Sequence, residues 1–335
     1  MKIWQSARTR TRTIQLFRNW LLLVCSCWLC ANSSLWAAEL NIRGNQLPVT
    51  LGQYLDYLED PSRERSIDDI RSGESEWQRS RQSIPTMGMS SSTFWFHIRL
   101  TGEDTAGQDL VLSLDSPTLD RIEFYFVRDD QLIQKSVLGD SIPTSQQSYP
   151  YRIPIVPFEQ APQGSETQVY IRVTSSSGIE IPLTLTTMGL LAVDQQGPLV
   201  ILGAFFAFLF LCFAASAILY FYLSHRQFLA YAQFFGGMIV YFLTTTGMGR
   251  VWFWGDTAEI NTRLSYVATA FIIMSLYLIG QYLRFDHRYR DSVNLILRFL
   301  SYAMLPVAVI FLIVPSLRLP RRSCYRSFIC RCWYH

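Results

Sequence analysis

QQGPLVILGAFFAFLFLCFAASAILYFYLS, residues 195–224, contains no charged side chain. Further uncharged runs follow it at Gln227–Gly249, Leu264–Leu283 and Phe299–Leu317. A helix needs about 20 apolar residues to cross the hydrocarbon core of a bilayer, and each run is that long or nearly so. The sequence therefore predicts a bundle of four transmembrane helices, at residues 199–223, 227–249, 264–283 and 299–317.

Charge is distributed unevenly along the 335 residues. Residues 39–197 hold 12 Lys and Arg against 22 Asp and Glu, a net charge of −10. The other residues hold 17 against 4, a net charge of +13. An acidic block thus lies between a basic N-terminus and a basic membrane region, and such asymmetry usually reflects membrane topology.

The N-terminus has the three parts of a secretory signal. Five basic residues between Lys2 and Arg18 precede the uncharged run Trp20–Ala31, and the small residues Ala37 and Ala38 follow. We expect a signal peptide over residues 1–38, with an uncleaved anchor helix as the alternative. Because residues 39–211 contain no cysteine, the exported domain must be stabilised by its core, which fits a bacterial periplasm.

The loops between the predicted helices indicate their orientation. With the acidic block outside, Ser224–Arg226 and Arg284–Arg298 face the cytoplasm, and the second of these carries four Arg. The loop Arg250–Arg263 then lies outside, with two Arg and two acids. This bias follows the positive-inside rule. We therefore expect a multi-pass protein of the bacterial inner membrane whose N-terminal domain is periplasmic.

Residues 318–335 break this pattern. They are basic, contain no acid and have neither helical nor strand periodicity, yet a fourth span would place them outside. Our hypothesis is that the chain is truncated or that its reading frame was lost near Arg318. A normal C-terminus is the alternative.

Several segments within residues 39–190 alternate with the two-residue period of half-buried strands. In Phe94–Leu100, for example, Phe94 and Phe96 share one face while Trp95 and His97 share the other. Turn-forming residues separate these segments, as in antiparallel sandwiches. We predict an all-β, jelly-roll-like sandwich over residues 39–190, a short helix within Leu51–Ile70, and a linker at residues 191–198. The other alternating segments are Leu110–Leu114, Ile122–Phe126, Val169–Val173 and Ile181–Leu185.

Motifs in a characteristic order make the chain similar to a known family. They include Leu51–Pro61 (LGQYLDYLEDP), Ser90–Leu100 (SSSTFWFHIRL) and Val169–Leu185 (VYIRVTSSSGIEIPLTL). The SHRQ turn at residues 224–227 and RVWFWGD at residues 250–256 extend the match into the membrane region. Over roughly residues 47–315, the chain resembles the bacterial seven-transmembrane receptors with diverse intracellular signalling modules, the DISM receptors, with a type 2 extracellular domain.

The resemblance implies a jelly-roll sensory domain, akin to carbohydrate-binding modules, that passes its signal to a seven-helix membrane unit. It also implies a cytoplasmic output module, such as a diguanylate cyclase, histidine kinase or phosphatase. This sequence has four predicted spans and no output module, which leaves autonomous signalling by the chain in doubt.

The non-core face of the predicted strands carries the candidate ligand site. Aromatic rings and hydrogen-bonding side chains on one surface are what sugar recognition needs. The alternatives are an ordinary solvated sheet face, or a face packed against the segment Glu39–Pro85. Glu123 lies on this face too, and the six residues expected to bind ligand are Trp95, His97, Arg99, Tyr125, Tyr170 and Arg172.

No motif for a metal, a nucleotide or a catalytic nucleophile is present in the sequence, so we expect no cofactor, no nucleic-acid partner and no enzymatic activity. We expect the chain to be the sensory input portion of a membrane receptor. Its ligand would be a small carbohydrate or a periplasmic protein, and a homodimer is a further expectation. The alternatives are a membrane-tethered carbohydrate-binding or adaptor protein and, third, a small transporter.

Overall fold

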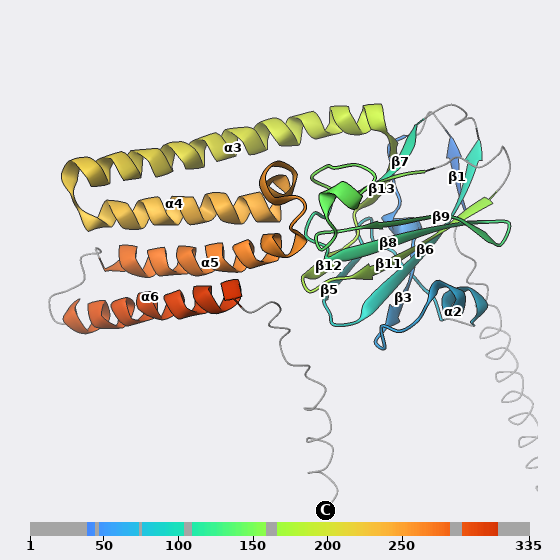
Figure 1. Ribbon diagram of the computed structural model, residues 1–335. Helices are drawn as coiled ribbons and strands as arrows, with labels where there is room; N and C mark the ends of the chain where they lie inside the picture. The colour runs from blue at the N-terminus through green and yellow to red at the C-terminus, as the bar shows by residue number, and fades with distance from the viewer. Residues whose placement is uncertain are drawn as a thin grey trace, which may run out of the picture. The chain divides into compact units, whose positions relative to one another are not determined.

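The computed structural model describes residues 39–43, 47–73, 76–103, 109–158, 166–281 and 290–313 (Figure 1). The expected signal peptide, residues 1–38, and the expected basic tail, residues 318–335, lie outside the described residues. The described part contains strands up to Thr187 and long helices after it.

The larger sheet of the N-terminal domain contains seven strands in the order β4-β3-β6-β11-β8-β9, with β1 beside β6. All the neighbouring pairs are antiparallel except β1 with β6, which is parallel. The strands are β1 (Glu39–Arg43), β3 (Asp56–Asp60), β4 (Gln78–Arg79), β6 (Thr93–Glu103), β8 (Arg121–Arg128), β9 (Gln131–Leu138) and β11 (Glu166–Thr174).

A four-stranded sheet, in the order β10-β7-β13-β2, forms the second layer, and β12 pairs with β5. Short 3₁₀ turns lie at Gly52–Tyr54 and Thr144–Gln146. The predicted antiparallel sandwich is therefore confirmed. The remaining strands are β2 (Val49–Thr50), β5 (Thr86–Met89), β7 (Leu110–Leu114), β10 (Ile155–Pro157), β12 (Gly178–Glu180) and β13 (Leu183–Thr187).

The main core fills the space between the two sheets. Alternate residues of the central strands point into it, as the two-residue period predicts. Phe96 of β6 and Phe124 of β8 are fully buried there, opposite Leu112 of β7 and Leu185 of β13. The hydrophobic side chains that the sequence assigns to one face of each strand are thus the ones that form this core.

The opposite face of the larger sheet is covered by helix α2 (Ile67–Ser72), which lies beside β3 in Figure 1. Ser66 and Asp69 form a reciprocal capping box that satisfies free backbone N–H groups at the start of α2. Ile70 of α2 and Trp77 pack in a second hydrophobic cluster on this face. The sheet is therefore buried on both sides near its centre.

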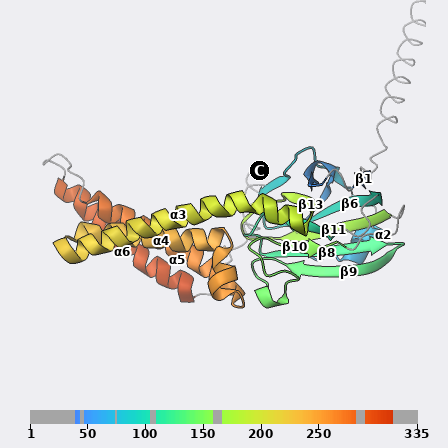
Figure 2. The same cartoon turned by 90° about the horizontal axis from the view of Figure 1, so that it is seen from above.

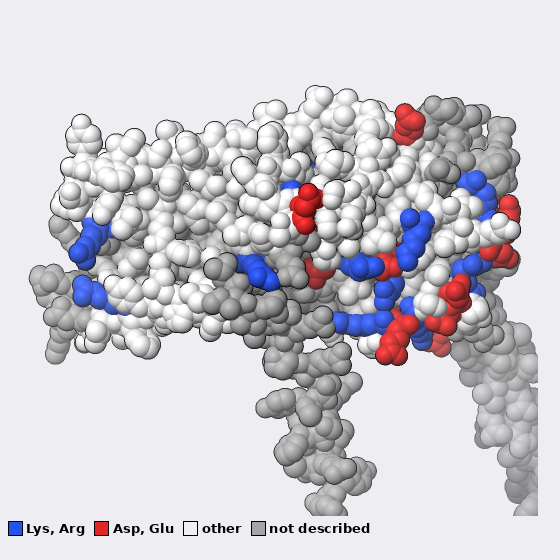
Figure 3. All heavy atoms as spheres, viewed as in Figure 1, with Lys and Arg blue, Asp and Glu red and all other residues white. Residues whose placement is uncertain are grey.

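Helices α3 to α6 lie side by side in chain order (Figure 1). Four helices are long and apolar enough to cross a membrane, which confirms the predicted bundle within the described residues. In Figure 3 their visible face is almost free of charged atoms, whereas charged side chains gather over the strands. The helices are α3 (Met188–Leu223), α4 (Arg226–Thr245), α5 (Ala258–Gly280) and α6 (Arg290–Ile313).

Strand β13 continues directly into helix α3, as Figure 2 shows from above. Thr187 is the last residue of the strand and also caps the helix, because its hydroxyl accepts a 3.3 Å hydrogen bond from the N–H of Leu190. Residues 191–198, expected as a linker, lie inside this helix. Leu191 packs against Ile153 and Ile155, so the first turns of α3 share a small core with the sandwich.

Glycines allow close packing of α4 against its neighbours. A Cβ atom at Gly236 would lie 3.4 Å from Phe213 of α3, and one at Gly237 would lie 3.0 Å from Ile272 of α5. This agrees with the general role of small residues between membrane helices.

Phe96→Ala is expected to lower the free energy of unfolding of the sandwich by about 3–5 kcal/mol, because it opens a cavity in a fully buried site. Urea unfolding of the detergent-solubilised chain, followed by tryptophan fluorescence, measures this change. The control Leu132→Ala removes an exposed side chain on β9 and should cost at most about 0.5 kcal/mol. Equal losses in the two variants would contradict the assignment of the core.

Candidate functional site

The structure brings the six residues expected to bind ligand into one cluster on β6, β8 and β11. His97, Tyr170 and Tyr125 are register partners across the three strands. Trp95 and Arg172 form the next row, opposite Glu123. Arg99 lies on the same face of β6, one pair further along. The two-residue period thus predicted which side chains share a face.

This face is covered rather than open. Trp95 is completely buried, and His97, Tyr125 and Tyr170 are less than 10 % exposed. Their cover comes from α2 and Trp77, which belong to the segment that the sequence offered as an alternative packing partner. Ligand contact by the six residues stays a prediction, and it requires this cover to move.

His97 is held as a neutral side chain within the covered cluster. Its ring stacks on Tyr170 with ring centroids 4.5 Å apart, and Trp77 lies on it at 5.5 Å. Burial, followed by the charge of Arg99, lowers the pKa of His97 to about 4. Such an environment suits a packing role better than proton transfer near neutral pH.

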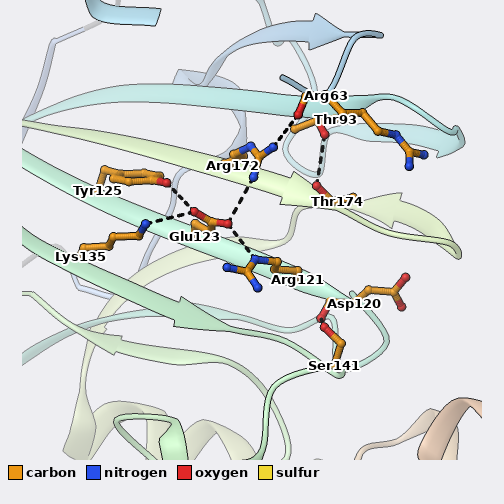
Figure 4. A network of polar contacts seen from close by, with 10 residues as sticks. All are labelled: Arg63, Thr93, Asp120, Arg121, Glu123, Tyr125, Lys135, Ser141, Arg172 and Thr174. Carbon is orange, nitrogen blue, oxygen red and sulfur yellow. Dashed lines mark hydrogen bonds and ion pairs between the residues drawn. The ribbon is translucent and has the colours of Figure 1, made fainter. Parts of the chain in front are cut away.

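Glu123 is the centre of a charged network on this face (Figure 4). Its carboxylate pairs with Arg121 at 2.7 Å, Arg172 at 3.3 Å and Lys135 at 3.5 Å, and it accepts a hydrogen bond from the hydroxyl of Tyr125. Burial alone would raise the pKa of Glu123. Hydrogen bonds from Tyr125 and Arg121, with the charges of Arg121 and Lys135, lower it to about 2.

Arg172 extends this network to the loop that follows β3. Its Nη2 donates a 2.9 Å hydrogen bond to the carbonyl oxygen of Arg63, while its Nη1 contacts Glu123 (Figure 4). The guanidinium also lies 5.9 Å from the Trp95 ring, within cation–π range. Strands β8, β9 and β11 and the loop after β3 are thereby joined through one carboxylate.

A cavity of about 690 Å³ opens beside β3, next to this loop. Its size is in the range of small-molecule sites. Beyond Tyr57, β3 has no pairing with β4, so one edge of the strand is left open to the cavity. The lining residues come from β3, β4, β5, β6 and the connections between them, and they are Tyr57, Leu58, Glu59, Arg65, Glu76, Gln78, Thr86, Met87 and Phe94.

Polar side chains dominate the cavity wall. The hydroxyl of Tyr57 donates to Gln78 at 2.8 Å, and Glu59 accepts from Ser92 at 2.6 Å. Glu76 and Arg65, also in the lining, are exposed. Two carboxylates against one guanidinium make the site slightly acidic, which disfavours anionic ligands. Carboxylates, an amide and a phenol are suited to forming hydrogen bonds with the hydroxyl groups of a neutral ligand.

Sequence reasoning missed this cavity. Strand β3 has the sequence DYLED. Its three acids do not predict a strand, because Asp and Glu are uncommon in strands. The cavity also depends on the distance between β3 and β5, which no local pattern reports. Among the described residues, no group of three or more His, Cys, Asp or Glu is arranged to hold a metal ion.

An antiparallel sandwich joined without a break to four membrane-crossing helices defines a multi-pass membrane protein with a folded domain beyond the bilayer. Two family models match the chain: 7TMR-DISM extracellular 2 over residues 52–187, and 7TM diverse intracellular signalling over residues 199–329. The resemblance seen in the sequence is confirmed, and the chain belongs to the DISM receptors.

No curated protein matches the sequence. The membrane-domain match continues to residue 329, past the last predicted span. The hypothesis of a reading frame lost near Arg318 stays a prediction, because those residues lie outside the described part.

Glu123→Gln is expected to lower the free energy of unfolding by about 3 kcal/mol at pH 7, since it removes the charge from a buried network. Because the folded-state pKa of about 2 lies below the ordinary value of 4.5, the stabilisation is fully present above pH 4.5. It is lost as the pH falls towards 2.

The measurement is a series of thermal unfolding curves between pH 7 and pH 3. The difference in melting temperature between the parent and the variant should stay constant above about pH 5 and shrink as the pH falls from 4.5 to 3. Lys135→Gln is the matched control, because it removes one exposed partner of the network and should cost at most about 1 kcal/mol. A constant difference between Glu123→Gln and the parent at every pH would refute the role given to the carboxylate.

Proposed function

We propose that this chain is the sensory input portion of a bacterial inner-membrane signal-transduction receptor. The sandwich is periplasmic, binds a small neutral carbohydrate or a similar polyol, and passes its state to the membrane helices. The observation that carries the proposal is the polar cavity beside β3 in a domain of the DISM extracellular family. The chemistry of output belongs to a cytoplasmic module of the kind found in relatives.

The composition of the cavity supports a hydroxyl-rich ligand. Sugar hydroxyls are both donors and acceptors, and Glu59, Glu76, Gln78 and Tyr57 offer both kinds of partner. The partly exposed Tyr57 ring adds apolar surface of the sort that stacks on a sugar ring. The net charge of −10 on residues 39–197 argues against polyanions.

A receptor role is supported by the junction between the sandwich and the bundle. Since β13 runs into α3 without an intervening loop, a rotation of the smaller sheet acts directly on the first helix. A ligand drives such a change only through its different affinity for two states of the protein. The charged residues of the sheet face are already engaged in structural pairs, which disfavours a catalytic role for this face.

Binding is tested on the full chain in lipid nanodiscs by a thermal-shift screen with neutral mono- and oligosaccharides and cell-wall fragments. A ligand that binds the folded state raises its melting temperature. For the best sugar found, Glu76→Gln and Tyr57→Ala should each raise Kd by about tenfold, the loss expected for one hydrogen bond to a charged group or one stacking contact.

The matched control is Asp129→Asn, which also changes an exposed acid to its amide but lies in the turn between β8 and β9. It should leave Kd unchanged. If Arg99→Gln abolishes binding while the cavity variants bind like the parent, the ligand contacts the sheet face instead. Binding that leaves hydrogen exchange of every helix unchanged would identify a tethered binding protein rather than a receptor.

A further inference from the structure

A second contact joins the sandwich to the membrane helices, separate from the β13–α3 junction. It is made by two segments: Gly139–Arg152, which follows β9, and the α4–α5 connection, residues 246–257. The N–H and the hydroxyl of Thr144 both donate to the carbonyl oxygen of Gly255, at 2.9 and 3.0 Å. The N–H of Ser145 donates to the carboxylate of Asp256 at 3.2 Å. These bonds fix the register of two segments more than 100 residues apart in sequence.

Arg250 is the buried centre of this contact. Its side chain is 2 % exposed, and Nη1 donates a 2.6 Å hydrogen bond to the carbonyl oxygen of Gly139. Its Nε and Nη2 have no hydrogen-bond partner among the residues that the structure describes. A buried guanidinium with unused donors is costly, so it persists only where the surrounding structure requires it.

Asp140 lies beside this guanidinium and is also incompletely paired. Its Oδ2 accepts a long, 3.5 Å hydrogen bond from Thr262, while its Oδ1 has no partner in the described part of the chain. Burial raises the pKa of Asp140 to about 6, against the opposing effects of Asn261 and Arg250. The two charges are not within ion-pair distance of one another. Both side chains therefore keep free hydrogen-bonding atoms, Nε and Nη2 on Arg250 and Oδ1 on Asp140.

Gly247 shows how closely the two segments approach. Its φ of +75° is in the left-handed region. A Cβ atom there would collide with the carbonyl oxygen of Arg152 and would lie 3.0 Å from Pro117. The side chain of Arg152 also donates to Gln195 of α3. The end of the segment Gly139–Arg152 is therefore held against both α3 and the turn that follows α4.

The Glu123 network leads to the same segment. Asp120 is adjacent to Arg121 of the network, and its carbonyl oxygen accepts from both the N–H and the hydroxyl of Ser141, at 2.9 and 2.6 Å (Figure 4). The N–H of Asp140 donates a 2.7 Å hydrogen bond to the carbonyl oxygen of Leu119. At its other end, the network reaches Arg63, two residues from Arg65 in the cavity wall. Hydrogen bonds, ion pairs and the short backbone stretches between them thus connect the cavity wall to Arg250.

We propose that Arg250 is a positioning residue that latches the segment Gly139–Arg152 to the α4–α5 connection, so that a shift in the larger sheet changes the packing of α4 and α5. In its second arrangement, the free donors of Arg250 contact the carboxylate of Asp140 in place of the Gly139 carbonyl. It acts beside the direct β13–α3 junction, and it does not depend on which ligand fills the cavity.

The test uses Glu123→Gln as a perturbation of the sheet in the full chain in nanodiscs, with hydrogen exchange read at residues 250–262. In the chain with Arg250, this perturbation should accelerate exchange at those amides by about fivefold, since about one hydrogen bond is weakened. In the Arg250→Met background, Glu123→Gln should have no further effect there. Arg250→Lys, which keeps the charge and a donor, should restore part of the response.

Arg226→Met is the matched control, because Arg226 lies at the start of α4, about 30 Å along the helix from the latch. The response to Glu123→Gln should be unchanged in this background. If Arg250→Met does not fold, Thr144→Val removes a single bond of the same contact and should reduce the response. The proposal is overturned if Glu123→Gln leaves residues 250–262 unaffected, or if its effect is equal with and without Arg250.

Discussion

The centre of the larger sheet is buried on both faces, and most of the properties of the sandwich follow from this constraint. One face packs on the smaller sheet, and the other lies under α2 and Trp77. A carboxylate at such a position is stable only when its charge is matched, and Glu123 is matched by three cations and a tyrosine hydroxyl. Because the faces are occupied, the cavity opens at the edge of the sheet, where β3 has lost its neighbour.

The same constraint explains how the sandwich can act on the membrane helices. A sheet that is packed on both sides cannot bend freely, so a disturbance at its edge shifts whole strands. The strands β13 and β9 end at the two places where the domain contacts the helices, namely the start of α3 and the Arg250 contact. One junction is a direct run of the chain from β13 into α3, while the other depends on an incompletely paired buried arginine. That difference makes the second junction the better candidate for control.

The family matches and the structure agree that the chain combines a DISM extracellular domain with a membrane domain. The aromatic and polar face that suggested sugar binding in the sequence is a packed interior in this structure, and the cavity beside it has the polar groups that such binding needs. The two sites are neighbours, since Leu58 of the cavity wall pairs in register with Trp95 of the covered face.

Local chemistry was sufficient to predict the four membrane helices, the antiparallel sandwich and the core face of its main strands. Uncharged runs and two-residue alternation are properties of neighbouring residues, and burial acts on them directly. The sequence could not tell that residues 191–198 continue a helix. It offered packing against Glu39–Pro85 as one alternative for the face carrying Trp95, but it could not decide that α2 and Trp77 cover this face. The cavity beside β3 and the pairing of Arg250 with Gly139 were equally hidden. These features depend on which distant segments of the chain meet. A solvated sheet face and a covered one can have the same two-residue periodicity, because the side chains that cover a face come from elsewhere in the sequence.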